Sequence, residues 1–448
     1  MSDHHNSPYC RLVELRQYTP LLHFQGDTEG ACLRASEVKP KLDRFVWDYL
    51  NRNQISIPES WQLKNMDEES PYEPALRYKM RFMGNMKKRE DKKHLLYFAQ
   101  NMDGTSIALE SLSNTRMTII SLVKDRLGTD CPLYNNKYLE NPTICELIDA
   151  LLPAFFCLHC FGTRNGKGFG SFEIVGSTIS DEEIDYYKER DCMKVYRLSS
   201  SRNSYSDMNC LDDIYVLSGM MKGGFNRPYY KGDIQKYLWR ENIGSEKSFI
   251  KQEIFPNETV NNTGESLLDW YNNDLCGGRN HRPQKVYKNN QFLRAMLGLT
   301  DHYDYFFYNR NLKKRVVKTI WVKSKNSEIT RFANPIRFKP CSGGFRILVY
   351  RIPNAMLNKS QASEDNGFEF SFSSKQYTLY TPEFFDLVAF MHYFLSPFHD
   401  NKSRKSHNWE ALKDKSYQLY YGKNNSQTRF FNDTLDNLRI AYGWEESI

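Results

Sequence analysis

A cluster of glycines stands between a helical pattern and a strand pattern over residues 143–179. Residues 143–161, TICELIDALLPAFFCLHCF, are almost wholly apolar and begin with Thr143, a residue type that favours helix N-termini. The stretch FGTRNGKGFGSFEI, residues 161–174, then holds four glycines with Arg164 and Lys167. The run SFEIVGSTI alternates apolar and polar residues, which predicts a strand. A P-loop needs a strand before its glycines and a helix after them, so this order argues against a nucleotide loop.

Two interpretations of this glycine turn remain open. In the first, the turn holds the phosphates of a polymer, because glycines let the main chain approach an anion closely and point N–H groups at it. Arg164 and Lys167 add charge, and Phe169 offers a ring for a base or a ribose. In the second, the stretch is a tight helix-to-strand turn that carries two solvated cations.

The preceding sequence predicts one strand and one long helix before a further pair of strands. Residues 11–24 alternate like a strand, and a helix from about Ser36 places apolar residues on one face at helical spacing. Residues 75–120 read as strands, with 87–93, KKREDKK, as a solvated loop between them. Residues 1–180 thus predict the order strand, helix, strands, helix, glycine turn, strand, which is typical of a ferredoxin-like split βαβ unit.

The remaining residues predict a second α+β unit. Residues 181–300 are polar and read as irregular, with helices expected at 264–275 and 290–299. Strands follow within 305–352, then a helix at 382–395, and the end of the chain reads as helix. We therefore expect an α+β chain of tandem ferredoxin-like (RRM-like) domains, the first over 1–180 and the second over 181–448. The second domain is expected to carry a large helical or irregular insertion at about 199–300.

The charge of the chain is concentrated in one segment. The 448 residues carry a formal net charge of only +7, but the segment from Arg310 to Arg346 has eleven Lys and Arg residues against one acid, Glu328. Aromatic residues such as Trp321 and Phe332 interleave with them. Cations for phosphates and rings for bases favour contact with nucleic acid. The alternative is a solvated sheet face beside a core.

Other signals predict no cofactor and no membrane segment. Cys157 and Cys160 form one C-x-x-C inside an apolar segment, with no second ligand pair at a spacing that suits zinc, so we expect buried thiols and no metal. We find neither a secretory signal nor an apolar run long enough to cross a bilayer. The sequence predicts a cytoplasmic protein.

Three blocks resemble the RAMP superfamily of CRISPR–Cas proteins, in family order, between about residues 15 and 340. They are TPLLHF with GACLRASEVKPKLDRF (19–24 and 30–45), the glycine turn, and LRAMLGLTDHYDYFFY with ITRFANPIRFKP (293–308 and 329–340). The last block is similar to the Arg-Ala-Leu-Leu-Gly-Leu and Arg-x-Ala-Ser-Pro segments of the large two-domain RAMP subunit of the type III-B, or Cmr, complex. Asn334 replaces the serine, and Pro40 stands where the first block usually has a glycine.

The resemblance implies a non-catalytic subunit that holds CRISPR RNA or target RNA by its backbone. It implies CRISPR RNA, target RNA and other RAMP subunits of a type III effector complex as partners, and no membrane. The residues expected to contact RNA are Arg34, Lys39, Lys41 and Arg44 at the helix start, Gly162, Arg164, Asn165, Gly166, Lys167, Gly168 and Phe169 in the glycine turn, and Lys313, Lys314, Arg315 and Arg331 in the basic segment.

An endoribonuclease is the alternative function. Some RAMP relatives cleave RNA with a general acid or base that acts on the 2′-hydroxyl. His23, after the first predicted strand, is the best candidate for this role, with Asp27 or Glu29 in the following loop as candidate carboxylates.

Overall fold

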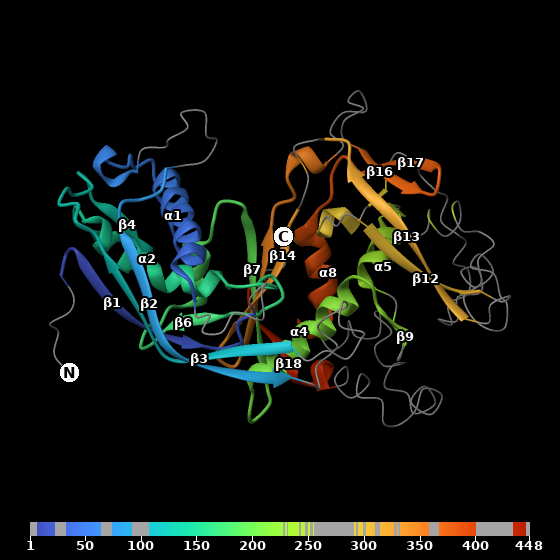
Figure 1. The fold of residues 1–448 in the computed structure, drawn as a ribbon, viewed down its shortest axis with the longest axis horizontal. Coiled ribbons are helices and arrows are strands. Elements are labelled where there is room, and N and C mark those ends of the chain that lie inside the picture. The colour runs from blue at the N-terminus through green and yellow to red at the C-terminus, as the bar shows by residue number, and fades with distance from the viewer. Residues whose placement is uncertain are drawn as a thin grey trace.

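The computed structural model describes residues 7–22, 33–63, 74–91, 107–226, 229–230, 232–241, 243–246, 250, 254, 291–292, 294–298, 302–309, 314–326, 329, 332–357, 367–399 and 433–444. Their fold mixes helices with three four-stranded antiparallel sheets and shorter strand pairs. Figure 1 shows the N-terminal sheet at one end, the sheet with β12, β13, β16 and β17 at the other, and the sheet with β7 and β14 between them.

The first sheet is built from the N-terminal elements. Its strands are β1 (Cys10–Gln17), β2 (Lys79–Asp91), β3 (Ile107–Ile120) and β6 (Phe172–Ile174), paired in the order β2-β3-β1-β6. Helix α1 (Ala35–Arg52) joins β1 to β2, and α2 (Ile144–Leu158) comes between β3 and β6. The described elements therefore follow the chain order expected for residues 1–180.

Both helices form where the sequence patterns place them. In α1, Val38, Leu42 and Phe45 lie on the buried face, as their spacing predicts. In α2, the side chain of Thr143 accepts a hydrogen bond from the main chain of Glu146, and the Glu146 carboxylate accepts one from the main chain of Thr143. This reciprocal capping satisfies two N–H groups that the first turn leaves without helical partners.

The second sheet repeats the same pattern with long interruptions. Its elements are β7 (Cys192–Ser200), α4 (Asp207–Met221), β14 (Ile336–Cys341), β15 (Gly344–Tyr350), α8 (Leu387–His399) and β18 (Leu438–Tyr442). The strands pair in the order β14-β15-β7-β18. Position for position, this is the order of the first sheet, with α4 and α8 in the places of α1 and α2.

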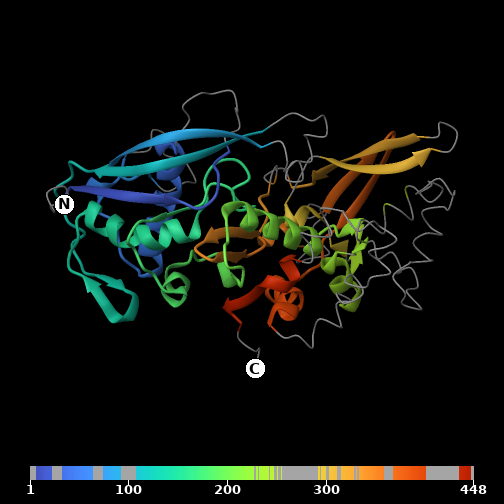
Figure 2. The ribbon, with the colours of Figure 1, turned by 90° about the horizontal axis from the view of Figure 1, so that it is seen from below.

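A third sheet comes from the interruptions. It consists of β12 (His302–Asn309), β13 (Lys314–Ser324), β16 (Gly367–Phe372) and β17 (Lys375–Tyr380), in that spatial order. Ile320, Val322 and Phe370 on one of its faces belong to the same core as the apolar residues of α4 and α8. In Figure 2 the sheet extends away from the first unit, at the far end of the molecule.

Several predicted boundaries are wrong. Residues 87–91 of the expected KKREDKK loop continue strand β2, because each pairs with a residue of β3 from Ser111 to Ile107. Residues 181–221, expected to be irregular, hold α3 (Asp181–Tyr187), β7 and α4. Ser180 and Ser206 cap the two helices there, a local signal that the polar composition masks.

Two predicted helices also differ from the described structure. The helix expected over 290–299 is absent from the described part of that range, where Gln291–Phe292 form the short strand β11 and Arg294–Leu297 form a 3-10 turn. The final described residues are a short helix over 433–437 followed by β18, because β18 completes the second sheet by pairing with β7. The helix expected at 264–275 lies outside the described residues.

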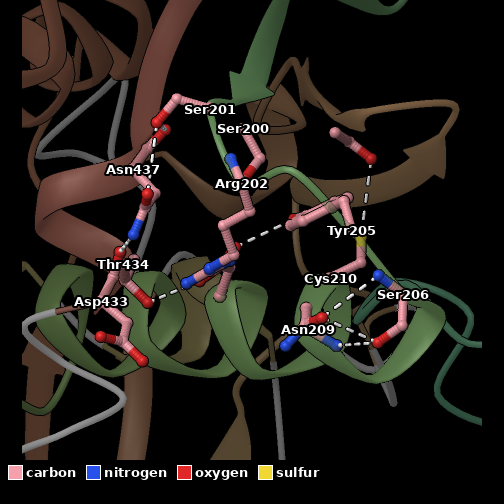
Figure 3. Close-up of polar contacts among 12 residues, drawn as sticks. Ser200, Ser201, Arg202, Tyr205, Ser206, Asn209, Cys210, Asp433, Thr434 and Asn437 are labelled. Carbon is pink, nitrogen blue, oxygen red and sulfur yellow. Dashed lines mark hydrogen bonds and ion pairs between the residues drawn. The ribbon is translucent and has the colours of Figure 1, made fainter.

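The buried carboxylate of Asp213 ties the last described elements to α4. Figure 3 shows its partners Arg202, Tyr205 and Thr434. Arg202 makes two hydrogen bonds to the carboxylate of Asp213, of which the Nη2–Oδ1 contact is 3.0 Å. The hydroxyl groups of Tyr205 and Thr434 donate to the same carboxylate over 3.0 and 2.7 Å. The main-chain N–H of Ser201 donates to the carbonyl oxygen of Asn437 over 2.9 Å. These contacts fix the 433–437 helix, and so position β18 beside β7.

Two buried cations of the second sheet reach into the first unit. Lys339 Nζ is 2.5 Å from Ser171 Oγ and 2.8 Å from the carbonyl oxygen of Phe172, and its side chain is fully buried. Arg346 Nε lies 2.9 Å from Asp181 Oδ1, and Arg346 Nη1 lies 3.5 Å from Glu173 Oε1. Because both cations are shielded from water and hydrogen-bonded, they hold β14 and β15 in one fixed position against β6 and α3.

Removing Arg346 is expected to destabilise the protein severely. In Arg346→Met, the carboxylates of Glu173 and Asp181 stay largely buried and lose this partner, which costs about 3 kcal/mol or more in the free energy of unfolding. The control is Arg116→Met, which removes a pair with Glu14 in which both side chains are more than half exposed, and should cost less than about 1 kcal/mol. Urea unfolding measures both; equal losses would contradict the role given to Arg346.

Candidate nucleic-acid interface

The glycine turn folds back on its own start. Gly162, Gly168 and Gly170 have positive φ values of 79°, 88° and 68°, a region that residues with a Cβ rarely adopt. The main-chain N–H of Phe161 donates to the carbonyl oxygen of Gly170 over 2.9 Å. A Cβ at Gly170 would collide with the carbonyl oxygen of Phe161. The glycines therefore serve a compact backbone conformation, whatever the turn binds.

The turn is also held by both units. The main-chain N–H of Gly162 donates to the carboxylate of Glu37 at the start of α1. On the other side, the N–H of Phe338 in β14 donates to the carbonyl oxygen of Gly166 over 3.1 Å. At Gly168 an added Cβ would lie 2.7 Å from Ile214 Cδ1 of α4. The turn is thus a rigid element between the two units.

A cavity of about 640 Å³ opens where the helix start, the glycine turn and β14 meet. Lys41, Arg44 and Arg337 supply cations to its wall, and Asn165 and Asn334 supply amides. The wall also contains three carboxylates, from Asp48, Glu189 and Asp191. Residues from each of the three resemblance blocks therefore meet at this one cavity, although they are separated by nearly 300 positions of sequence.

Arg337 is held in place by a chain of contacts along the cavity wall. Its guanidinium lies 4.2 Å from the centre of the Tyr350 ring, a distance at which the cation is attracted to the ring. The Tyr350 hydroxyl donates to Glu189 Oε2 over 2.7 Å, and Glu189 Oε1 lies 3.3 Å from Nε2 of His159. The predicted site residues did not include Arg337, His159 and Glu189, because nothing local to them shows that they share a cavity.

The cluster keeps Glu189 ionised. Burial favours the neutral acid, but the charge of His159 and the hydrogen bonds from His159 and Tyr350 outweigh it and lower the pKa of Glu189 to about 2. The other ring nitrogen of His159, Nδ1, lies 3.0 Å from the carbonyl oxygen of Phe155.

The helix-start cations divide into two groups. Lys39 is occupied within the first unit, since Nζ is 2.7 Å from Asp43 Oδ2 and 2.8 Å from the carbonyl oxygen of Leu76, and it lies away from the cavity wall. Lys41 reaches the cavity, although Nζ also donates to the carbonyl oxygen of Cys160 over 3.0 Å. Burial lowers the pKa of Lys41. Arg44 is exposed and reaches the cavity. Arg34 is also exposed and lies directly before the first residue of α1.

The side chains of the glycine turn also differ in their surroundings. Burial lowers the pKa of Arg164, and desolvation together with the charge of Arg164 lowers the pKa of Lys167. Phe169 is only 2% exposed and packs against Leu22 and Leu211, so the expected stacking of its ring on a base or ribose is wrong for this conformation. Its apolar ring instead fixes the turn to α4.

The side chains of the basic segment lie in different surroundings. Lys339 and Arg346 point into the interface between the units, Arg337 lines the cavity, and Trp321 on β13 is 57% exposed. Lys314 and Arg315 begin β13, which fixes their main chain only. Lys313 and Arg331 lie outside the described residues, as do the nuclease candidates His23, Asp27 and Glu29.

The C-x-x-C pair is buried, as predicted. Cys157 and Cys160 are 4% and 8% exposed, and burial raises the pKa of the Cys157 thiol to about 12. Within the described ranges, no group of three or more His, Cys, Asp or Glu side chains is arranged to hold a metal ion. No helix in that part of the chain is long and apolar enough to cross a membrane.

Comparison with protein-family models defines the class of protein. Residues 10–225 match the Cmr1 N-terminal domain, and residues 229–417 match the Cmr1 C-terminal domain. The chain therefore belongs to the Cmr1 family of CRISPR–Cas RAMP proteins of the type III-B, or Cmr, system, which confirms the resemblance seen in the sequence. No curated protein matches the chain.

Two solved structures resemble the chain only remotely. The apo crystal structure of Cmr1 from Pyrococcus furiosus is 11% identical, with a TM-score of 0.34 over 87% of this chain and 96% of that one. A cryo-EM structure of the type III-B Cmr-beta complex, bound to cognate target RNA and AMPPnP in the presence of single-stranded DNA, contains a chain that is 10% identical. It has a TM-score of 0.31 over 82% of this chain and 96% of that one. These scores are too low to support a statement about the fold.

Substitution at Gly170 tests whether the turn requires the positive φ of this residue and its close approach to Phe161. Gly170→Ala combines a positive φ with a collision at Phe161, and should cost well over the roughly 1–2 kcal/mol of a left-handed residue alone. Gly176→Ala is the matched control, because Gly176 has a φ of 76° and open space around it. The free energy of urea unfolding is measured for both. A Gly170→Ala loss no larger than that of the control would mean that the turn relaxes easily.

The Glu189 cluster predicts a specific acid sensitivity. Since the pKa of Glu189 falls from 4.5 to about 2 on folding, its contribution is complete above pH 4.5 and disappears as the pH falls through 2. The difference in unfolding free energy between the wild type and Glu189→Gln should shrink by about 3 kcal/mol over that window. Urea unfolding at a series of pH values measures it. A difference that stays constant with pH would show that Glu189 is not held ionised by its partners.

Proposed function

We propose that this chain is a non-catalytic RNA-binding subunit of a type III CRISPR antiviral effector complex. It contacts CRISPR RNA, target RNA or both through the cavity described above, and it works in the cytoplasm beside other RAMP subunits. The observation that supports this most is the meeting of the helix start, the glycine turn and Arg337 around one cavity. Family membership gives the setting, and the geometry suggests the surface.

The chemistry of the cavity suits a single strand of RNA. Lys41, Arg44 and Arg337 provide charge for phosphates, and Asn165 and Asn334 provide hydrogen bonds in both directions. Carboxylates such as Asp191 accept hydrogen bonds from the amino groups of an unstacked base or from a ribose hydroxyl. A duplex presents its bases to one another, so it offers fewer partners to this mixture of groups.

We further propose that the two repeated sheets are tandem ferredoxin-like domains with their boundary near residue 180. The support is that β7 pairs with β15 and β18 and with no strand of the first sheet, and that α4 shares a core with β14, β15 and α8. On this division, the large insertion of the second domain follows α4 instead of starting near 199.

Cleavage of RNA is the competing function. The carbonyl oxygen of Leu22 accepts a hydrogen bond from the N–H of Thr163 over 2.7 Å, so the residue next to His23 lies on the glycine turn. This proximity keeps His23 worth testing as a catalytic acid or base.

RNA titration of the full chain tests the proposal. Labelled single-stranded RNA, DNA of the same sequence and an RNA duplex are titrated at several salt concentrations, and each sample is also run on a denaturing gel. We expect salt-dependent binding that favours single-stranded RNA, without cleavage. Arg44→Gln with Arg337→Gln should reduce the salt slope by about 1.4, because each phosphate that a cation neutralises on a single strand adds roughly 0.7 to that slope.

A control and two contrary results complete the test. Lys137→Gln removes an exposed lysine of β5 (Lys137–Leu139), outside the cavity, and should leave the affinity unchanged. No binding by the wild-type chain would contradict the proposal. Cleavage that disappears in His23→Ala, with binding retained, would establish the nuclease instead.

A further inference from the structure

A third cation lies near Arg164 and Lys167, and no local sequence pattern singles it out. Lys222 follows the last residue of α4 and is partly buried. Its Nζ donates a hydrogen bond to the carbonyl oxygen of Leu297 over 3.3 Å. Burial, together with the charge of Lys167, lowers the pKa of Lys222 to about 7. That influence of Lys167 means that the two ammonium groups lie within electrostatic range of each other.

Side-chain packing explains why these lysines come together. The glycine turn packs on α4 through Phe169 and Leu211, and Gly168 lies beside Ile214. The helix then continues to Lys222, so the turn and the C-terminal end of α4 share one side of the molecule. The packing that buries Phe169 is therefore also what brings Lys222 toward Lys167.

Lys222 is linked to the cavity through the segment that it contacts. Gly298, directly after Leu297, would place a Cβ 3.7 Å from both the carbonyl oxygen of Phe332 and the N–H nitrogen of Asn334. Asn334 lines the cavity together with Asn165 and Gly166 of the glycine turn. The segment of Leu297 and Gly298 thus lies between Lys222 at the end of α4 and Asn334 in the cavity wall.

Among the described residues, neither Lys167 nor Lys222 forms an ion pair with a carboxylate, and Lys167 is the charged group that acts on Lys222. A neutral amide would satisfy the Leu297 carbonyl without repulsion from Lys167. Lysine is favoured only if its charge has a use, and an anion between the two ammonium groups would supply one.

We propose that Lys222 and Lys167 together bind a backbone phosphate of the RNA, and extend the RNA path from the cavity to the C-terminal end of α4. This inference rests on the proposed RNA-binding function. A phosphate fits the remaining donors, since each ammonium group has three N–H bonds and Lys222 uses one of them on Leu297.

Substitutions at Lys222 separate charge from structure. Lys222→Gln keeps an N–H donor for Leu297 but loses the charge, whereas Lys222→Arg keeps both. We expect Lys222→Gln to weaken single-stranded RNA binding by about tenfold and to lower the salt slope by about 0.7, with unfolding free energy nearly unchanged. Lys222→Arg should restore most of the affinity, and the control Lys137→Gln should match the wild type.

Proton uptake on RNA binding is a second measurement. A lysine with a purely structural role would not contribute to it. The phosphate should raise the pKa of Lys222 from about 7, so the wild type should take up protons when it binds RNA near pH 7. Calorimetric titration in buffers of different ionisation heat measures this uptake, and Lys222→Gln should lose most of it. The labelled RNA and the full chain are those of the preceding titrations.

The outcomes decide between the two proposals. If the wild type binds RNA but Lys222→Gln binds with the same affinity and salt slope, the role of Lys222 is wrong and the RNA-binding function stands. If Lys222→Gln lowers affinity only as far as it lowers stability, and Lys222→Arg fails to restore it, the lysine is structural. If the wild type binds no RNA, both proposals fail.

Discussion

The arrangement of the two units depends on two cations that leave water entirely. Lys339 and Arg346 extend from the second sheet and end on acceptors at Ser171, Phe172 and Glu173 of the first unit and at Asp181, the first residue of α3. Charges of this kind tolerate few geometries, because each small displacement leaves a polar group without a partner. Strand β14, which carries Lys339, also carries Phe338 and Arg337. The N–H of Phe338 donates to the glycine turn, and Arg337 faces the cavity. A rigid junction between the units is therefore also what gives the cavity its shape.

Sequence patterns predicted the elements of the first unit well, because their causes are local. Thr143 and the apolar spacing of α1 act within a few residues. The glycine turn was found for the same reason. The second sheet was harder to predict, since β7 pairs with β15, a strand that lies more than a hundred residues later in the chain. The polar sequence around Ser206 also hid a helix start, because capping residues and loop residues are the same types.

The candidate site shows where composition fails as a guide. A basic residue looks the same in sequence whether it faces solvent, a cavity or an interface between units. Consecutive cations of β14 illustrate this, since Arg337 faces the cavity and Lys339 is sealed in the core. Lys39 and Lys41 differ in the same way on α1. Which of these positions meets a ligand is decided by tertiary contacts that no local pattern encodes.

The order of pairing in the second sheet has a consequence for how the chain is made. Strand β7 lies between β15 and β18, and both of its neighbours are synthesised much later than β7 itself. The first sheet, in contrast, has all of its strands by Ile174. During translation, a finished first unit would precede a β7 whose two edges stay unpaired, and an unpaired edge can add a strand from another chain. The buried carboxylate of Asp213 captures the helix over 433–437, so that edge of β7 can close only after residues 433–442 have been synthesised.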